Sequence, residues 1–391
     1  MAGRKKDLTK LGVDAPDPHT VRITLRAPNL ALPAILAVIR PAHRASVEAN
    51  GRDAFKPGHI VSNGAYQLIE WQPQTRMVAV KNPQYWDAAN VHVDRVEYYP
   101  VEDPAEELKR YRAGDLDITN TVPNDQVPFI KATLAAEYHT APWLGVYYLG
   151  FNQSRPPFKD NLKLREALTL AIDRDTLVDK VAIAGYIAAK GWIPPGIEGY
   201  PNAAGPWYGL SKEEREAKAR ADYKEAGYGP DHPLQVDLLY NTNENNKKVM
   251  IAIAGMWKQL LGVQTQLSNQ EFKTMLDVRR EKKTTEVFRA GYIAFYQDPG
   301  PLLDVLRPSN PRNDLGYDSS TYEALYKAGA EALDPAARLA GLAKAEEQAL
   351  TDLPIAPIYH YAAQHLIKPY VKGWQPSPLD NFRSQDMEIV K

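Results

Sequence analysis

The sequence predicts an α/β fold, because segments with helical patterns and segments with strand patterns alternate along the chain. Residues 235–267 are the clearest unit, with a strand, a polar loop, a helix and, after Gly262, a second strand. This order is typical of the βαβ crossover of a parallel sheet. The composition agrees, since 391 residues with 44% hydrophobic and 24% charged side chains are enough for two or three globular domains.

The other elements are predicted from local signals in chain order. Val21, Ile23 and Leu25 alternate with polar residues, which predicts a half-buried strand over residues 20–25. Residues 64–81 contain two strand-like runs around a Gln-Pro-Gln turn and predict a hairpin. Capping signals predict three helices: one from Asp103 and Pro104 to Gly114, one from Ser211 and Glu214 to near Gly227, and one that starts at Asp334 and Pro335.

Charge and cysteine content exclude several functional classes. Lys and Arg number 47 and Asp and Glu 48, a formal net charge of -1, so we expect no nucleic-acid partner and no attraction to anionic membranes. The absence of cysteine excludes thiol nucleophiles, disulfides and Cys-ligated metals. Residues 1–7 are basic with no apolar run behind them, so we expect no signal peptide in this chain, and no segment is apolar enough to span a bilayer.

No catalytic motif is found. The sequence has no nucleophile elbow, Walker loop, dinucleotide fingerprint or zinc-protease helix. His360 and His365 lie five apart in a strand-like segment and are expected on opposite faces, so a metal site there is a minority interpretation beside packing or surface histidines. We therefore expect a protein that is not an enzyme, with no catalytic residue, no metal site and no cofactor.

Two stretches are candidates for ligand binding. The polar loop from Asn241 to Asn246 follows a strand of the βαβ unit, where open α/β sheets bind ligands, although on sequence alone a solvated loop with a helix cap is the better supported interpretation. Arg279 and Arg289 lie near aromatic residues. An arginine in an apolar strand suits either a structural salt bridge or a clamp for a carboxylate. Glu271 is the one carboxylate expected near them, as a salt-bridge partner more readily than as a general base.

Several motifs then resemble a known family along nearly the whole chain. They include Asn63-Gly-Ala-Tyr66, Asn82-Pro-Gln-Tyr-Trp-Asp87, Arg110-Tyr-Arg-Ala-Gly-Asp115, Arg165-Glu-Ala-Leu168 and Pro378-Leu-Asp-Asn381. This series resembles the family 5 extracellular solute-binding proteins of ABC importers, and within them it is most similar to periplasmic oligopeptide-binding proteins. The resemblance implies a two-lobed binding protein that closes over a small peptide or peptide-like solute and delivers it to a membrane permease.

The resemblance also implies how the chain is divided. Residues 1–144 with 363–391 would form the first lobe and residues 145–362 the second, with hinges near Tyr147 and Tyr361. The N-terminal part of the first lobe and an extra small domain of the family would have no counterpart here. The resemblance implies a periplasmic or extracellular, membrane-associated location, and we expect a monomer. Since no signal peptide is expected, a cytoplasmic location is the alternative.

Ligand-binding residues are carried over from the family position by position. Arg279 and Arg289 match arginines that bind the peptide carboxylate, and Gly291 lies in the strand that pairs with the peptide backbone. Phe295 replaces an aspartate that binds the peptide amino group, which leaves at most a cation–π contact with an ammonium. The complete set implied by the resemblance and the sequence is Trp143, Asn241, Asn246, Phe272, Arg279, Arg289, Gly291, Tyr292, Ile293, Phe295 and Tyr361.

Other functions remain open on the sequence. Phe272, Asn246 and Trp143 replace a Trp, a His and a Tyr of the peptide-binding relatives, so the ligand could instead be an N-blocked peptide, an opine, a sugar or a metal chelate. A different class of function is an accessory or interaction protein that derives from an oligopeptide-binding protein and has no transport role.

Overall fold

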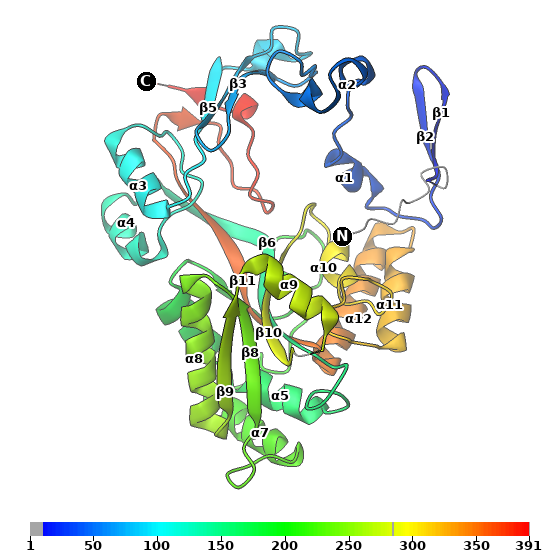
Figure 1. Ribbon diagram of the computed structural model, residues 1–391, viewed down its shortest axis with the longest axis vertical. Helices are drawn as coiled ribbons and strands as arrows, with labels where there is room; N and C mark the ends of the chain where they lie inside the picture. Colours follow the sequence, from blue (N-terminus) through cyan, green and yellow to red (C-terminus); the bar gives the residue numbers. More distant parts are fainter. Residues whose placement is uncertain (1–10, 284, 391) are drawn as a thin grey trace.

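The computed structural model describes residues 11–283 and 285–390 and has the predicted α/β architecture. Figure 1 shows an upper lobe and a lower lobe joined by the long strands β6 and β11. The basic start of the chain, residues 1–7, lies outside the described residues. Among the described residues, no helix combines the length and apolarity needed to cross a bilayer.

The strands form four sheets within the described ranges. The largest has the order β7-β11-β6-β10-β8-β9, and the others are β3-β4-β5, β1-β2 and β12-β13. The strands are β1 (Val13–Asp17), β2 (Thr20–Ile23), β3 (Tyr66–Gln72), β4 (Arg76–Lys81), β5 (Arg95–Tyr98), β6 (Tyr138–Phe151), β7 (Ile187–Ala188), β8 (Gln235–Asn241), β9 (Gln264–Gln270), β10 (Val287–Ile293), β11 (Ile355–Leu366), β12 (Val371–Lys372) and β13 (Glu388–Ile389).

Helices cover the large sheet in the lower lobe (Figure 1). The α-helices are α1 (Leu32–Ala37), α2 (Arg44–Asn50), α3 (Pro104–Ala113), α4 (Val127–Thr133), α5 (Leu162–Leu170), α6 (Arg174–Thr176), α7 (Lys212–Glu225), α8 (Glu244–Leu261), α9 (Phe272–Glu281), α10 (Gly300–Asp304), α11 (Ser320–Ala330) and α12 (Pro335–Asp352).

The predicted capping signals are confirmed. Asp103 accepts a hydrogen bond from the backbone of Ala105 at the start of α3, and Gly114 ends that helix in the left-handed conformation. Ser211 and Glu214 form a reciprocal capping box on α7. Asp334 caps α12. These short-range bonds satisfy backbone groups that a helix end leaves unpaired, which is why they could be predicted without tertiary information.

The positions of the predicted strands are confirmed, but the predicted burial of one of them is not. β8, α8 and β9 form the expected βαβ unit, with β8 parallel to β9, and residues 64–81 contain the antiparallel hairpin β3–β4. The strand expected over residues 20–25 exists as β2. The prediction that it is half-buried is wrong, because all of its side chains are exposed. Among the described residues, β2 pairs with β1 alone, whose side chains are also exposed, and no core of this part of the chain covers its apolar face.

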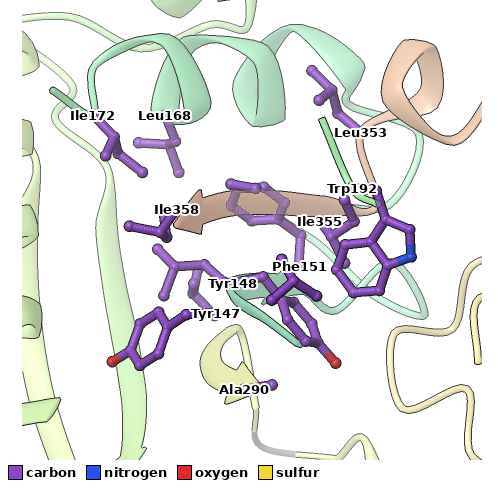
Figure 2. Close-up of a cluster of buried hydrophobic side chains, with 14 of the residues drawn as sticks. Tyr147, Tyr148, Phe151, Leu168, Ile172, Trp192, Ala290, Leu353, Ile355 and Ile358 are labelled. Carbon is purple, nitrogen blue, oxygen red and sulfur yellow. The ribbon is translucent and has the colours of Figure 1, made fainter. Parts of the chain in front are cut away.

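The two lobes have separate hydrophobic cores. Leu108, Tyr111 and Ile130 form a core in the upper lobe with Leu366 at the end of β11. The lower lobe has a much larger core (Figure 2), where side chains of β6, β10 and β11 meet those of α5 and the segments beside it. β6 and β11 pair from Tyr138 and Leu366 in one lobe to Gly150 and Ile355 in the other, with register shifts around Tyr359 and Tyr361. The predicted lobe boundaries and hinges fall on these two strands and stay predictions.

Candidate functional site

One edge of β10 is open where the lobes meet. β10 pairs with β6 along its length, but with β8 only at Val287 and Phe288. Bonds from Asn152 N to Glu286 O and from Ala294 N to Leu144 O mark the residues of this segment that bond toward β6. Because antiparallel strands alternate their bonding direction, the backbone groups of Arg289, Gly291 and Ile293 point away from β6. This edge can accept an added extended chain.

The guanidinium of Arg289 lies beside this open edge. Its Nη1 donates to Asn241 Oδ1 at 3.0 Å, and its Nη2 donates to the hydroxyl of Tyr361 at 3.1 Å. Its carbon Cζ lies 4.5 Å from the centre of the Tyr147 ring. These partners are all neutral, and no carboxylate of the described chain forms a salt bridge with Arg289. An arginine is always charged, so the site holds a largely buried positive charge that an anionic ligand would stabilise.

A hydrogen-bond network holds the partners of Arg289. Asn246 donates from Nδ2 to Asn241 Oδ1 at 3.0 Å, and its own Oδ1 accepts from the hydroxyl of Tyr147 at 3.2 Å. Asn243, in the same loop, caps α8 by accepting from the backbone of Asn246. The helix-cap interpretation is confirmed for Asn243, and the other two asparagines lie in the network of Arg289. Ligand binding by this loop stays a prediction.

Aromatic rings continue the site behind Arg289. The rings of Tyr147 and Tyr359 stack at 4.5 Å between centres, and Tyr186 stacks on the other side of Tyr359 at 4.6 Å. Tyr361 meets Tyr147 and Tyr186 edge-on. Trp143 contacts Tyr361 at 5.9 Å. The Nε1 of Trp143 is buried and makes no hydrogen bond to the described residues, so it remains a donor for a ligand.

Arg279 does not join Arg289. Its Nη2 forms a salt bridge of 3.0 Å with Asp314, and both side chains are nearly buried. The guanidinium lies over Phe288, the neighbour of Arg289 on β10. Successive side chains of a strand point to opposite faces, so the two arginines lie on opposite faces of the sheet. The salt-bridge interpretation holds for Arg279 in this structure, and the two arginines do not form a single clamp.

Glu271 is not the partner of Arg279, so that expectation is wrong. Its carboxylate accepts hydrogen bonds from the backbone of Lys273 and Thr274 and caps α9. These two bonds lower the pKa of Glu271. The carboxylate is therefore held in its charged form as a helix cap, and a role as a general base is not supported.

The remaining candidates are divided between faces and exposures. Ile293 lies on the same face as Gly291 and Arg289, whereas Tyr292 points to the opposite face with the lower-lobe core. Phe272 and Phe295 are 53% and 66% exposed. Both large rings are thus available for apolar contact. The structure gathers Trp143, Asn241, Asn246, Arg289, Gly291, Ile293 and Tyr361 and leaves Tyr292 and Arg279 on the other face.

The two histidines of β11 are buried and have separate partners. His360 lies 3.2 Å from the carbonyl of Gly191, while His365 bonds the carbonyl of Thr119 and the carboxylate of Asp380. The packing interpretation thus fits both. The described residues contain no group of three His, Cys, Asp or Glu side chains arranged to hold a metal.

Sequence reasoning missed two contributors to the site and the partner of Arg279 outside it. Asp314 neutralises Arg279, and Tyr147 and Tyr359 support Arg289 and Tyr361. A signal was present for Tyr147, since Trp143, Gly145 and Tyr147 alternate along one face of β6. No local signal points to Asp314, which lies in a turn far along the chain from α9.

Comparison with known proteins identifies the family of this chain. Residues 2–314 match the family described as bacterial extracellular solute-binding proteins, family 5 Middle. The chain is 37% identical to the periplasmic oligopeptide-binding protein OppA of Escherichia coli, over 99% of this chain and 72% of that protein. It is also 33% identical to the probable deoxycholate-binding periplasmic protein YgiS of Escherichia coli, over 98% of this chain and 72% of that protein.

Solved structures give the same result. The murein tripeptide binding protein MppA of Escherichia coli superposes with a TM-score of 0.82 at 35% identity, covering 98% of this chain and 75% of that one. OppA of Haemophilus influenzae in complex with the peptide RPPGFSPFR superposes with a TM-score of 0.80 at 32% identity, covering 99% of this chain and 76% of that one.

Proposed function

Because this chain belongs to the family 5 bacterial extracellular solute-binding proteins, we propose that it is the substrate-binding component of an ABC importer. Its ligand is a peptide-like solute with a carboxylate, bound between the two lobes. It acts by binding and not by catalysis, as a monomer outside the cytoplasm, and hands the solute to a membrane permease. The periplasmic location and peptide ligands of its relatives support this assignment.

The charge of Arg289, which no carboxylate of the described residues neutralises, supports the proposal that the ligand has a carboxylate. Its hydrogen bonds go to Asn241 and Tyr361, which orient the guanidinium without cancelling its charge. The open edge of β10 begins at the same residue, so a ligand can pair with the backbone near Gly291 while its carboxylate meets Arg289. The indole Nε1 of Trp143 offers a further donor.

The exposed ring of Phe295 favours a second class of ligand, one without a free amino group. This ring is 66% exposed, and Asp298, three residues further along, is already paired with Arg338 at 2.7 Å. An ammonium group at this end of the site would find a ring but no free carboxylate from these residues. Carboxylates with an apolar far end, such as N-acylated peptides, therefore fit better than peptides with a free amine. The deoxycholate-binding relative is consistent with such a ligand class.

The test is calorimetric titration of short peptides in four forms, with the amino end free or acetylated and the carboxyl end free or amidated. We expect amidation to weaken binding by about tenfold or more, since a charge-assisted hydrogen bond contributes about 1.5–3 kcal/mol. Arg289→Gln should remove this preference. Arg307→Gln is the matched control, because Arg307 also lies over a tyrosine ring but pairs with Glu323. Equal affinity for acid and amide would contradict the role of Arg289.

A further inference from the structure

Tyr361 lies in a slot that two glycines leave open. Its side chain starts on β11 and reaches across β6 to β10, in the strand order β11-β6-β10. A Cβ atom added at Gly145 on β6 would stand 2.7 Å from the ring of Tyr361, and one at Gly291 on β10 would stand 2.6 Å from its hydroxyl. Real Cβ contacts are longer than this, so a side chain at either position would displace Tyr361 from its path.

The walls of the slot are aromatic. Trp143 and Tyr147 lie two residues before and two after Gly145, so their side chains share its face of β6. Their ring centres are 5.9 Å and 6.3 Å from that of Tyr361. The Tyr361 ring is thereby fixed on both sides, and its hydroxyl can occupy few positions.

The hydroxyl of Tyr361 contacts the guanidinium of Arg289. It accepts a hydrogen bond of 3.1 Å from Nη2, while Asn241 accepts from Nη1 and the Tyr147 ring lies against the guanidinium. The guanidinium is held from three directions by groups without charge. Without the hydroxyl, the Nη2 side would lose its restraint, and the planar fork could turn about its remaining contacts.

We propose that Tyr361 is the positioning residue that aims Arg289 and thereby sets the preference of the site for a carboxylate. This inference rests on the proposed function for its effect on binding, but not for its effect on Arg289. Tyr361 also belongs to β11, one of the two strands that join the lobes, so Arg289 is oriented by a residue of the connection between them.

The first test needs no ligand. Crystal structures of Tyr361→Phe and Gly291→Ala should show the Arg289 guanidinium displaced from Asn241 or from the Tyr147 ring. Tyr326→Phe is the matched control, because Tyr326 is also a half-buried tyrosine against an arginine, in a separate part of the lower lobe. An Arg289 side chain unmoved in Tyr361→Phe would overturn the inference, whatever the ligand proves to be.

The second test compares affinities for N-acetyl-trialanine and its C-terminal amide. Tyr361→Phe should reduce the preference for the acid, measured as the ratio of the acid affinity to the amide affinity, by about tenfold. Gly291→Ala should reduce the preference likewise, but add little in the Tyr361→Phe background, where the added methyl meets no hydroxyl. An unchanged preference in Tyr361→Phe would overturn the inference. If the wild type binds neither peptide, the proposed peptide-like ligand fails while the crystallographic result still decides the inference.

Discussion

The imidazole of His365 joins the carboxylate of Asp380 through a hydrogen bond of 2.7 Å between Nε2 and Oδ1. Its Nδ1 lies 2.8 Å from the carbonyl oxygen of Thr119. A carbonyl and a carboxylate only accept hydrogen bonds, so both ring nitrogens must donate and the imidazole carries a charge. Burial alone would lower the pKa of His365, but the bonds to Asp380 and Thr119 raise it overall. Glu107 favours the charge as well.

This pair predicts a stability that falls as the pH rises. A raised histidine pKa in the folded state adds stability below the unfolded value of about 6.5 and loses it as the pH passes the folded pKa. Asp380→Asn should therefore lower the free energy of unfolding by about 1–2 kcal/mol at pH 6, with a smaller difference at pH 9. Denaturant unfolding at both pH values measures this.

Asp386→Asn is the control for that experiment, because Asp386 lies in the same C-terminal segment but forms an exposed pair with Arg383. It should show a small effect with no trend through this pH range. An NMR titration of His365 that gives a pKa at or below the ordinary value would contradict the prediction.

The salt bridge between Arg279 and Asp314 predicts a large stability effect. Both side chains are nearly buried, so Asp314→Ala leaves a buried charge without its partner. We expect a loss of about 3–5 kcal/mol in the free energy of unfolding. The double variant Arg279→Met with Asp314→Ala should recover much of that loss, since it removes the charge as well. A double variant as unstable as the single one would show that the pair is not the cause.

Local signals predicted much of this fold, and the residues explain why. Asp103, Ser211 and Asp334 act within three residues of their own helix ends, so the sequence contains all of each interaction. The same holds for the βαβ unit, whose periodicity reflects burial on one side of a sheet. The overall two-lobed arrangement came from resemblance and not from such signals.

The assembly of the site could be predicted only in part. Tyr361 and Arg289 meet across 72 positions in the sequence, and their contact depends on which strands are neighbours in the sheet. The opposite placement of Arg279 depends on the face that α9 covers. Neither fact follows from composition or spacing. The resemblance to the family indicated the candidate residues, and the strand order determines which of them lie next to each other.

The buried carboxylate of Glu346 in the lower lobe holds the segment around Trp192 and Tyr200 through hydrogen bonds. Glu346 accepts hydrogen bonds from the backbone of Trp192 and Ile193 and from the hydroxyl of Tyr200, each at 2.8 Å. Glu346→Ala would leave these buried donors unpaired and should cost about 3 kcal/mol or more in stability. Glu346→Gln keeps an acceptor and should cost less. Thermal unfolding of both variants tests this, and equal losses would contradict it.

The same carboxyl adds a pH dependence with a defined sign. Burial raises the pKa of Glu346 from 4.5 to about 7, against the opposing effect of its hydrogen bonds. A folded pKa above the unfolded one means that its contribution to stability is lost as the pH rises from about 4.5 through 7. Glu346→Gln has no carboxyl to titrate, so this component of the pH dependence should be absent. Stability measured between pH 4 and 8 would show whether it is.

The last prediction concerns the end of the site at Phe295. Phe295→Asp places a carboxylate on an exposed position in the turn after β10, where little packing is lost because the ring is 66% exposed. An opposite charge would favour the ammonium of a free peptide, so the variant should gain about tenfold in affinity for peptides with a free amine. Its affinity for N-acetylated peptides should fall or stay level, because the new charge gives them no partner. Phe272→Asp, at the other exposed ring, serves as the control and should show no such gain. If the wild type already prefers the free amine, as measured by calorimetry, then the amine is recognised elsewhere, and Phe295 does not set the ligand class.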